Sequence, residues 1–302
     1  MMRKINTKGK RSFSGGFTLI EVLVVVSIIG LLLSILIPSM RKARARSRAV
    51  SCGTNLRTLG QAWTIYAGDN RGLSVPGRLP AFEEGGFSSD RNVYRISTGM
   101  KYRPRWPALL QDDVGDVAIR HPSTTRSRQN YHSKVYVCPS VSGWTDERNA
   151  AYGYNYQFLG SHRLNEGRLR NLPVPLARIR AISKTVVMAD SNGSAAAFGR
   201  HDRADYSNQG RNEHRRGNYG WILDPPRLEA TSSRAGGDGT PRTAPDERHS
   251  GTANVLFADG HVHARTLTEL GYAVASDGSV LETDAKAHNR FFSGRGTDEP
   301  PP

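Results

Sequence analysis

Apolar residues near the N-terminus follow two successive patterns. Residues 17–37 form a nearly continuous apolar segment of 21 residues, in which Glu21 is the single charged side chain. About 20 apolar residues are enough to cross roughly 30 Å of hydrocarbon. After Pro38, apolar residues recur at helical spacing until the turn-forming sequence GDNRG at 68–72, and this stripe comprises Cys52, Leu56, Leu59, Trp63 and Tyr66. The patterns predict one long helix over 17–67, transmembrane in its first half and kinked near Pro38, which lacks a backbone donor.

The chain beyond residue 72 changes to short apolar segments separated by Gly, Pro, Ser and Arg. Three of these segments, KVYVC (134–138), TVVMAD (185–190) and ANVLFA (253–258), are rich in Val and aromatic residues and predict strands. The polar stretch 191–252 offers little to bury and indicates a functional loop or local disorder. The fold class expected is α+β, a long N-terminal helix packed on a small antiparallel β-sheet head with long loops. The head should cover 68–284, and we expect a disordered tail over 285–302.

The formal net charge of +15 is concentrated around the apolar segment. Glu21 is the single acidic residue among the first 48, which also contain ten basic residues and leave 32 basic and 26 acidic residues for the rest of the chain. Basic residues on both sides of an apolar helix suit phospholipid headgroups. A nucleic-acid-binding protein would instead carry a basic stripe on its folded part. We therefore expect a membrane and no nucleic acid among the partners.

Three interpretations of the apolar segment follow from the residues alone. A cleavable signal peptide has a shorter apolar region and a small-residue cleavage site, neither of which is present here. An ordinary membrane anchor fits the length but leaves Glu21 unexplained, since a carboxylate at a bilayer centre costs about 2.5–3.5 kcal/mol. If a peptidase cuts after Gly16, Phe17 supplies a free amine one helical turn from Glu21. The amine of one subunit could then pair with the Glu21 carboxylate of its neighbour, so that the charge favours assembly in register.

The sequence GGFTLIEVLVVVSIIGLLLSILIP (15–38) resembles the leader and methylation segment of type IV pilins and type II secretion pseudopilins. The resemblance rests on Gly16, Phe17, Thr18, Leu19, Glu21 and Pro38 and covers about 50 residues. It implies that residues 1–16 are a leader removed by a prepilin peptidase, that Phe17 becomes N-methylated, and that the helices bundle in a filament core. Glu21 and Pro38 are accordingly the expected assembly residues.

The chain contains two cysteines, and their spacing is not typical of a zinc site. Cys52 lies on the helical stripe and Cys138 at the end of a predicted strand. A disulfide between them would join the helix to the sheet and contribute about 2–4 kcal/mol. Two buried free thiols are the alternative.

Near the C-terminus, HSGTANVLFADGHVHAR (249–265) combines a hairpin signal with several potential ligands. Asp259-Gly260 between alternating segments predicts a two-residue type I′ turn. The pattern His249-x9-Asp259-Gly260 resembles the C-terminal signature of a large pseudopilin-like family of planctomycete-type bacteria, and YVCPS (136–140), YGYN (152–155) and ISKTVVMADS (182–191) resemble its other landmarks. That resemblance implies architecture and processing rather than a ligand.

We expect these C-terminal residues to be structural, with His249 bonded to the hairpin backbone and Asp259 serving the turn. The alternative is a metal site, for which the candidates are His249, Asp259, His261, His263 and the loop acids Asp190, Asp238 and Asp246. Alternating Tyr152, Tyr154 and Tyr156 predict rings on one strand face, for cross-strand packing or, alternatively, for stacking on sugars.

The sequence thus predicts a structural subunit, not an enzyme, without a cofactor. It would sit in the cytoplasmic membrane as a single-pass protein with a periplasmic head, and assemble into a type II secretion pseudopilus or related filament. Expected partners are the prepilin peptidase/methyltransferase, other pilin-like subunits and the inner-membrane assembly platform. The alternative is a type IV pilus-like surface fibre subunit whose head binds carbohydrate or cargo.

Overall fold

A computed structural model describes residues 18–80, 92–160, 162–165, 168–171, 173–204, 213–228, 241–282 and 284–300. The chain divides into two compact units, with the boundary between Arg44 and Ala45. The first helix, α1 (Leu19–Asp69), continues across this boundary and through Pro38 without interruption. Relative to the predicted range of 17–67, the helix begins two residues later and ends two residues later. At its C-terminus the Gly72 N–H donates to the Ala67 carbonyl (2.7 Å), and both Arg71 and Gly72 have positive φ, so the predicted turn sequence does end the helix.

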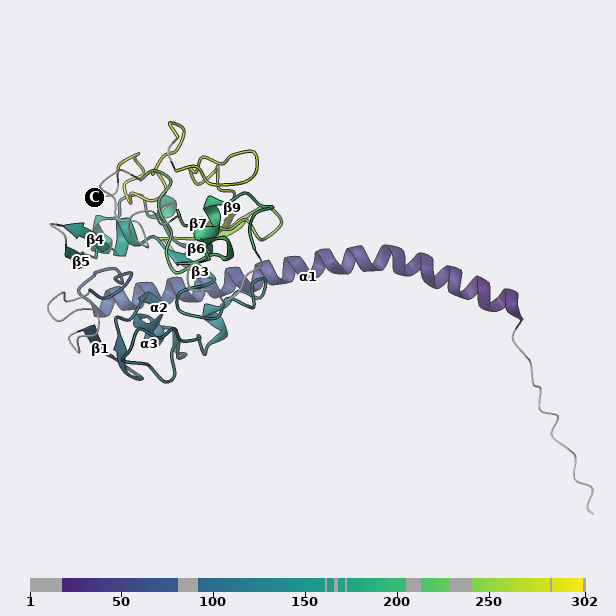
Figure 1. Cartoon of the computed structure of the whole chain (residues 1–302), viewed down its shortest axis with the longest axis horizontal. Coiled ribbons are helices and arrows are strands. Elements are labelled where there is room, and N and C mark those ends of the chain that lie inside the picture. Colours follow the sequence, from purple (N-terminus) through teal and green to yellow (C-terminus); the bar gives the residue numbers. More distant parts are fainter. Residues whose placement is uncertain are drawn as a thin grey trace, which may run out of the picture. The chain divides into compact units, whose positions relative to one another are not determined.

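In its described residues, the second unit contains one larger antiparallel sheet and two separate hairpins (Figure 1). The larger sheet has the order β3-β6-β8-β9, with β7 also paired to β6, and consists of β3 (Tyr152–Tyr154), β6 (Val186–Gly193), β7 (Ala244–Pro245), β8 (Ala253–Phe257) and β9 (Val262–Arg265). The hairpins are β1 (Val93–Ile96) with β2 (Gly99–Tyr102), and β4 (His162–Asn165) with β5 (Arg168–Asn171). Two single-turn helices, α2 (Trp106–Leu109) and α3 (Gln111–Val114), follow the first hairpin. The α+β class predicted from the sequence is confirmed.

The C-terminal part of α1 packs on one face of this sheet, as the apolar stripe predicted. Cys52, Leu56, Leu59 and Trp63 are buried and share a core with Leu256 of β8. Close approach depends on Gly60, because a Cβ there would lie 2.7 Å from Leu256 Cδ1. The helix and the sheet therefore enclose one shared hydrophobic core.

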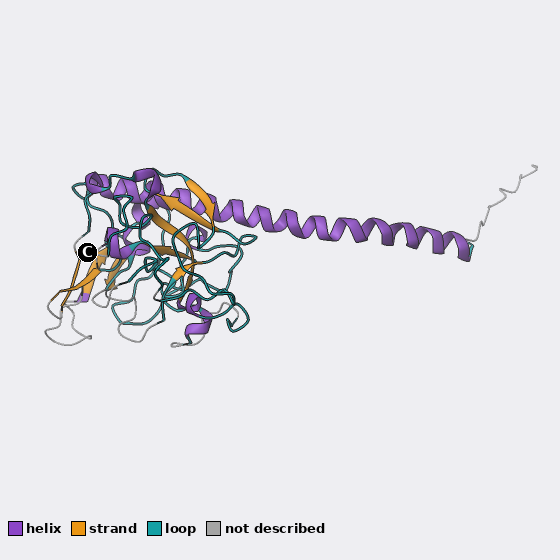
Figure 2. Cartoon of the chain, turned by 90° about the horizontal axis from the view of Figure 1, so that it is seen from above, coloured by secondary structure: helices purple, strands orange, loops and turns teal. Residues whose placement is uncertain are grey.

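The opposite face of the sheet is covered by the C-terminal part of the chain. Val186, Ala189, Val255 and Phe257 pack there in a second core with side chains from loops that follow the strands, among them Leu223, Leu270, Tyr272 and Phe292. Every residue of β6 and β8 is consequently buried. Loops account for much of this unit, as Figure 2 shows in teal.

Three expectations about the head differ from the structure. KVYVC does not form a strand: Lys134–Tyr136 is a 3₁₀ turn, started by the Ser133 hydroxyl accepting from the Val135 N–H, and Cys138 lies in the loop after it. The described parts of 191–252 bury Trp221, Ile222 and Leu223 rather than lacking a core. The expected disordered tail, 285–302, is described up to residue 300, and its residues Asn289 and Phe292 are fully buried. In each case tertiary contacts supply partners that a local pattern does not reveal.

Candidate functional site

The N-terminal segment begins with a helix cap that joins Thr18 to Glu21. The Thr18 N–H and hydroxyl both donate to Glu21 Oε2, at 2.8 and 2.7 Å, and the Glu21 N–H donates to Thr18 Oγ1 at 3.3 Å. This reciprocal pattern is the capping box of Thr-x-x-Glu sequences. The cap was readable in the sequence but was not recognised there. Gly16 and Phe17, the expected processing residues, lie outside the described residues.

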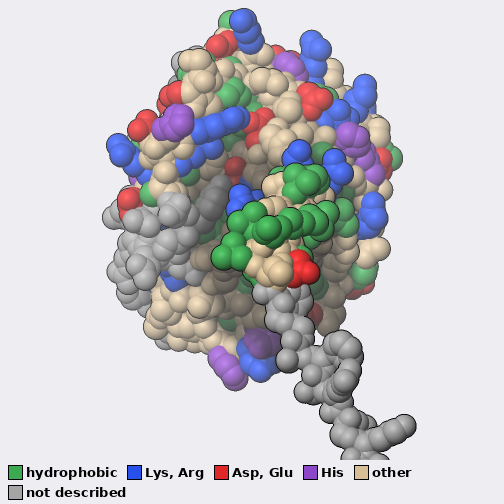
Figure 3. Space-filling view, turned by 90° about the vertical axis from the view of Figure 1, so that its right-hand side faces the viewer, with side chains coloured by type: hydrophobic (Ala, Val, Ile, Leu, Met, Phe, Trp, Pro, Cys, Tyr) green, Lys and Arg blue, Asp and Glu red, His purple; other side chains and the backbone are tan. Residues whose placement is uncertain are grey.

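The first part of α1 is an apolar helix with exposed side chains all around it. Leu19, Ile20, Leu23, Leu31 and Ile35 are each more than half exposed, and Figure 3 shows apolar side chains around the N-terminal end of the helix. Two hydroxyls in the segment are satisfied internally: Ser27 donates to the Leu23 carbonyl (2.8 Å) and Ser34 to the Leu31 carbonyl (2.7 Å). By length and composition α1 is a candidate membrane span. Such a surface is unfavourable in water and suits lipid or the apolar face of another helix.

Basic residues follow the apolar segment directly on α1. Arg41, Lys42, Arg44, Arg46 and Arg48 are all exposed. Within the second unit, the face seen in Figure 3 has basic and acidic side chains interspersed. The concentration of positive charge is therefore a property of the helix next to its apolar part, which fits a headgroup region.

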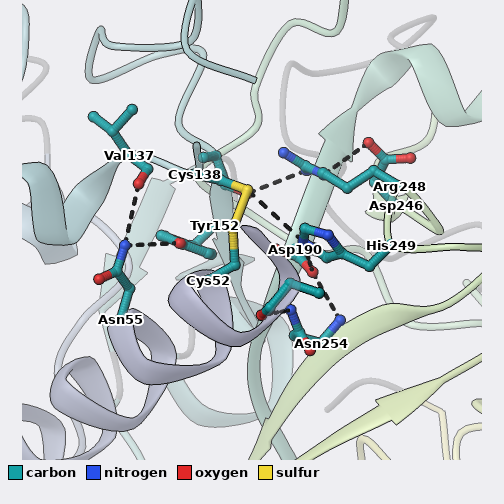
Figure 4. The surroundings of a disulfide bond; sticks show 12 residues. Cys52, Asn55, Val137, Cys138, Tyr152, Asp190, Asp246, Arg248, His249 and Asn254 are labelled. Atoms are coloured by element: carbon teal, nitrogen blue, oxygen red, sulfur yellow. Dashed lines mark hydrogen bonds and ion pairs between the residues drawn. A yellow bond between two sulfur atoms is a disulfide. The ribbon is translucent and has the colours of Figure 1, made fainter. Parts of the chain in front are cut away.

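A second candidate site surrounds the disulfide that joins α1 to the head (Figure 4). Cys52 and Cys138 are bonded, with 5.4 Å between their Cα atoms, and both are fully buried. The Asn55 amide, one turn further along α1, donates to the Val137 carbonyl (3.1 Å) and bonds the Tyr152 hydroxyl (3.2 Å). The disulfide and this amide together hold α1 against the loop that follows the 3₁₀ turn and against β3.

His249 faces the disulfide and Asp190 rather than the hairpin turn. Its Nε2 lies 3.2 Å from Asp190 Oδ2 and 3.8 Å from Cys138 Sγ, and all of these side chains are almost completely buried. Asp190 Oδ2 also accepts the Asn254 N–H at 2.7 Å. The expected bond to the hairpin backbone is made instead by the His249 main chain, which exchanges hydrogen bonds with Thr252. Asp190 was a candidate in the sequence, but no local spacing indicated that it would meet His249.

Burial of this cluster affects the neighbouring tyrosine. Desolvation raises the pKa of the Tyr152 phenol, and the Asp190 carboxylate raises it further. The hydrogen bond that the Tyr152 oxygen accepts from Asn55 lowers this pKa, but desolvation is the larger effect, so the hydroxyl stays protonated and neutral.

Asp259 and Gly260 form a turn, but of a different type from the one predicted. The Gly260 N–H donates to the Phe257 carbonyl and the Phe257 N–H to the His261 carbonyl, both at 2.9 Å. Only Gly260 of the pair has a positive φ (+87°), whereas a type I′ turn needs positive φ at both central residues. The connection is thus a three-residue loop ending in a left-handed glycine, a common hairpin form that tolerates Asp before the glycine.

The other candidate ligands are separated from His249. Asp259 pairs with His261, whose ring also stacks on Phe257, and His263 Nδ1 contacts the Ala264 carbonyl. Asp246 forms an ion pair with Arg248 (3.0 Å), and Asp238 lies outside the described residues. His249, Asp259, His261 and His263 therefore do not form one ligand set.

The three alternating tyrosines are core residues. Tyr152, Tyr154 and Tyr156 are each at most 1% exposed, and Tyr154 accepts a hydrogen bond from Trp63 Nε1 of α1 (3.4 Å). Tyr156 lies outside β3, at the start of a π-helical turn (Tyr156–Gly160). Packing therefore accounts for these rings, and none of them is exposed for stacking on a sugar.

Comparison with known proteins gives a family match at the N-terminus and a match to a curated protein. The family described as a prokaryotic N-terminal methylation motif matches residues 11–37. The type IV major pilin protein PilA of Myxococcus xanthus (strain DK1622) is 40% identical over 86 residues, which are 27% of this chain and 36% of that protein. The chain thus covers about a third of the length of this curated relative. No solved structure matches.

Proposed function

We propose that the protein is a prepilin-like structural subunit. The proposal is supported by the match of its N-terminal segment to the prokaryotic N-terminal methylation motif and by its similarity to a type IV major pilin. It is inserted in the cytoplasmic membrane as a single-pass protein, with residues 1–16 inside and the head in the periplasm. A prepilin peptidase cuts between Gly16 and Phe17 and the Phe17 amine is methylated. The mature subunits then assemble through their apolar helices into a type II secretion pseudopilus or a related filament.

The observation that carries this proposal is the coincidence of the methylation motif with an exposed apolar helix. The motif covers residues 11–37, and α1 begins two residues after the proposed cleavage site. Exposed leucine, isoleucine and valine side chains surround this part of α1, which a membrane or a bundle of identical helices would cover. A structural role needs no catalytic group.

Glu21 has a place in this mechanism. In the single chain its carboxylate is bonded only locally, by Thr18, within the described residues. Its negative charge in an apolar environment would still favour a cationic partner. The Phe17 amine of a neighbouring subunit is the proposed partner, and an inner-membrane assembly platform would bring the subunits together.

Processing is tested by mass spectrometry of the N-terminus of the protein isolated from its own cells. The expected mature form begins at Phe17 with a methylated amine. Gly16→Glu should leave an uncut precursor, since a large charged side chain replaces hydrogen beside the scissile bond. Gly9→Glu, the same change within the leader but away from that bond, is the matched control and should be cut normally. A native chain that retains residues 1–16 would contradict the proposal.

The alternative is a surface fibre of type IV pilus kind whose head binds a carbohydrate or a secreted cargo. The head has a pocket of about 390 Å³ that would admit a small ligand, lined partly by Arg178, Arg180, Arg295 and Glu299. Labelling of intact cells with a membrane-impermeant reagent distinguishes the two, because a surface fibre would be labelled and a periplasmic pseudopilus would not. Neighbouring genes for a secretion ATPase would favour the pseudopilus.

A further inference from the structure

Four buried side chains with metal-binding atoms converge where α1 meets the sheet. They come from four separate parts of the chain: Cys52 from α1, Cys138 from the loop after the 3₁₀ turn, Asp190 from β6 and His249 from the turn before β8 (Figure 4). One ligand atom from each lies within 4.8 Å of all the others. Among the described residues this is the group of Cys, His, Asp and Glu side chains whose spacing suits a metal ion.

The distances in this group resemble the edges of a zinc tetrahedron. Typical zinc bonds of about 2.0–2.3 Å place a nitrogen and an oxygen ligand about 3.4 Å apart, and a nitrogen and a sulfur ligand about 3.6 Å apart. His249 Nε2 lies 3.2 Å from Asp190 Oδ2 and 3.8 Å from Cys138 Sγ. Two of the required edges are thus already formed, and the sulfur atoms would have to separate to about 3.8 Å.

Asp190 supplies an independent sign that the site is built for a cation. Its side chain is completely buried, and its Oδ1 has no hydrogen-bond partner within the described part of the chain. An orphaned buried carboxylate oxygen is costly unless a proton or a metal ion compensates it. Asp190 is also held in place, because Oδ2 accepts the Asn254 N–H.

We propose that reduction of the Cys52–Cys138 disulfide converts this cluster into a Zn²⁺ site with two thiolates, the Asp190 carboxylate and the His249 imidazole as ligands. An external dithiol transfers two electrons and two protons to the disulfide, giving two thiols, and is itself oxidised to a disulfide. Binding of Zn²⁺ then releases the two thiol protons to solvent. Two thiolates, one imidazole and one carboxylate are all established zinc ligands, and four of them complete a closed structural site.

Disulfide and zinc exclude one another, because a sulfur atom in a disulfide is not a thiolate. The disulfide joins two of the four segments and zinc would join all four, so zinc would replace the covalent link between α1 and the head when the thiols are reduced. The head would then keep its attachment to α1 in either redox state. This inference does not depend on filament assembly.

The test uses the full chain in detergent, reduced with a phosphine and kept free of oxygen. Reduced wild-type protein should bind about one Zn²⁺ per chain by elemental analysis, and with Co²⁺ it should show a thiolate-to-metal charge-transfer absorption. Oxidised protein should show neither. His249→Gln and Asp190→Asn should each weaken zinc binding at least about tenfold in competition with a chromophoric chelator. His261→Gln, which alters the exposed His261–Asp259 pair, is the matched control and should bind zinc as the wild type does.

Two further measurements on reduced wild-type protein cover the case in which a variant fails to fold. Zinc should slow alkylation of Cys52 and Cys138 by iodoacetamide and should raise the unfolding temperature. Reduced wild-type protein that binds no zinc, or shows neither protection nor stabilisation, overturns the proposal. If His249→Gln and His261→Gln lose the same amount of zinc affinity, the assignment of His249 as a ligand is overturned as well.

Discussion

The two roles of Glu21, helix cap and charged assembly group, can be separated by two substitutions. Glu21→Gln removes the charge but keeps an oxygen that can accept from Thr18, since Gln replaces Glu in capping boxes. Thr18→Val removes the hydroxyl, which donates to Glu21 at 2.7 Å, and keeps the carboxylate. If the charge favours assembly, Glu21→Gln should reduce incorporation into filaments strongly, and Thr18→Val should reduce it little.

The expected sizes differ enough to be distinguished. Loss of a cap costs about 0.5–2 kcal/mol, which corresponds to about 2- to 30-fold in an equilibrium. An uncompensated carboxylate costs about 2.5–3.5 kcal/mol at a bilayer centre, which corresponds to about 70- to 400-fold. Glu21 lies in the first turn of α1 and already accepts two hydrogen bonds from Thr18, so we expect the lower end of that range.

The assay compares the mature subunit in sheared filaments with that in the membrane fraction, quantified by mass spectrometry of the same peptide. Only variants with the mature N-terminus are compared, which removes effects on cleavage. If Glu21→Gln assembles like the wild type, charge pairing is refuted. If Thr18→Val reduces incorporation into filaments as much as Glu21→Gln does, the helix cap rather than the charge accounts for the effect.

Two predictions concern the head and are measured as urea unfolding of the detergent-solubilised chain, followed by Trp fluorescence. Cys138→Ser removes a disulfide that spans 86 residues and should lower the free energy of unfolding, by about 4.6 kcal/mol in the chain-entropy model and by about 2–4 kcal/mol for typical disulfides. Metal-free wild-type protein under reductant should lose the same amount of stability. An unchanged unfolding midpoint would contradict the stabilising role of the disulfide with Cys52. Gly60→Ala should destabilise the head, because the added Cβ would lie 2.7 Å from Leu256 Cδ1. Overpacking of this kind costs about 1–3 kcal/mol, which exceeds the gain of about 0.8–1 kcal/mol in helix propensity. Gly53→Ala, where the nearest atom is at 3.7 Å, is the matched control and should stabilise; equal effects at both glycines would argue against the packing explanation.

Local patterns predicted those parts of the protein whose environment follows from neighbouring residues. The long helix, its apolar stripe and its end at GDNRG depend on spacing along one element. The strands at TVVMAD and ANVLFA depend on short apolar runs that contain Val. The turn at Asp259-Gly260 was located correctly but given the wrong type. The turn type depends on the number of loop residues, which the register between β8 and β9 sets. The local sequence does not specify this register.

The sequence by itself determined the N-terminal half of α1, because a continuous apolar segment with Thr18 and Glu21 at its start specifies a capped, lipid-compatible helix without help from distant residues. Only the tertiary structure decided the surroundings of Cys138, which a local pattern assigned to a strand. The tertiary fold also brings Asp190 and His249, which are 59 positions apart, together beside the disulfide. The physical reason is that burial of a charged side chain depends on partners brought together by strand pairing and helix packing, which no spacing along the chain encodes.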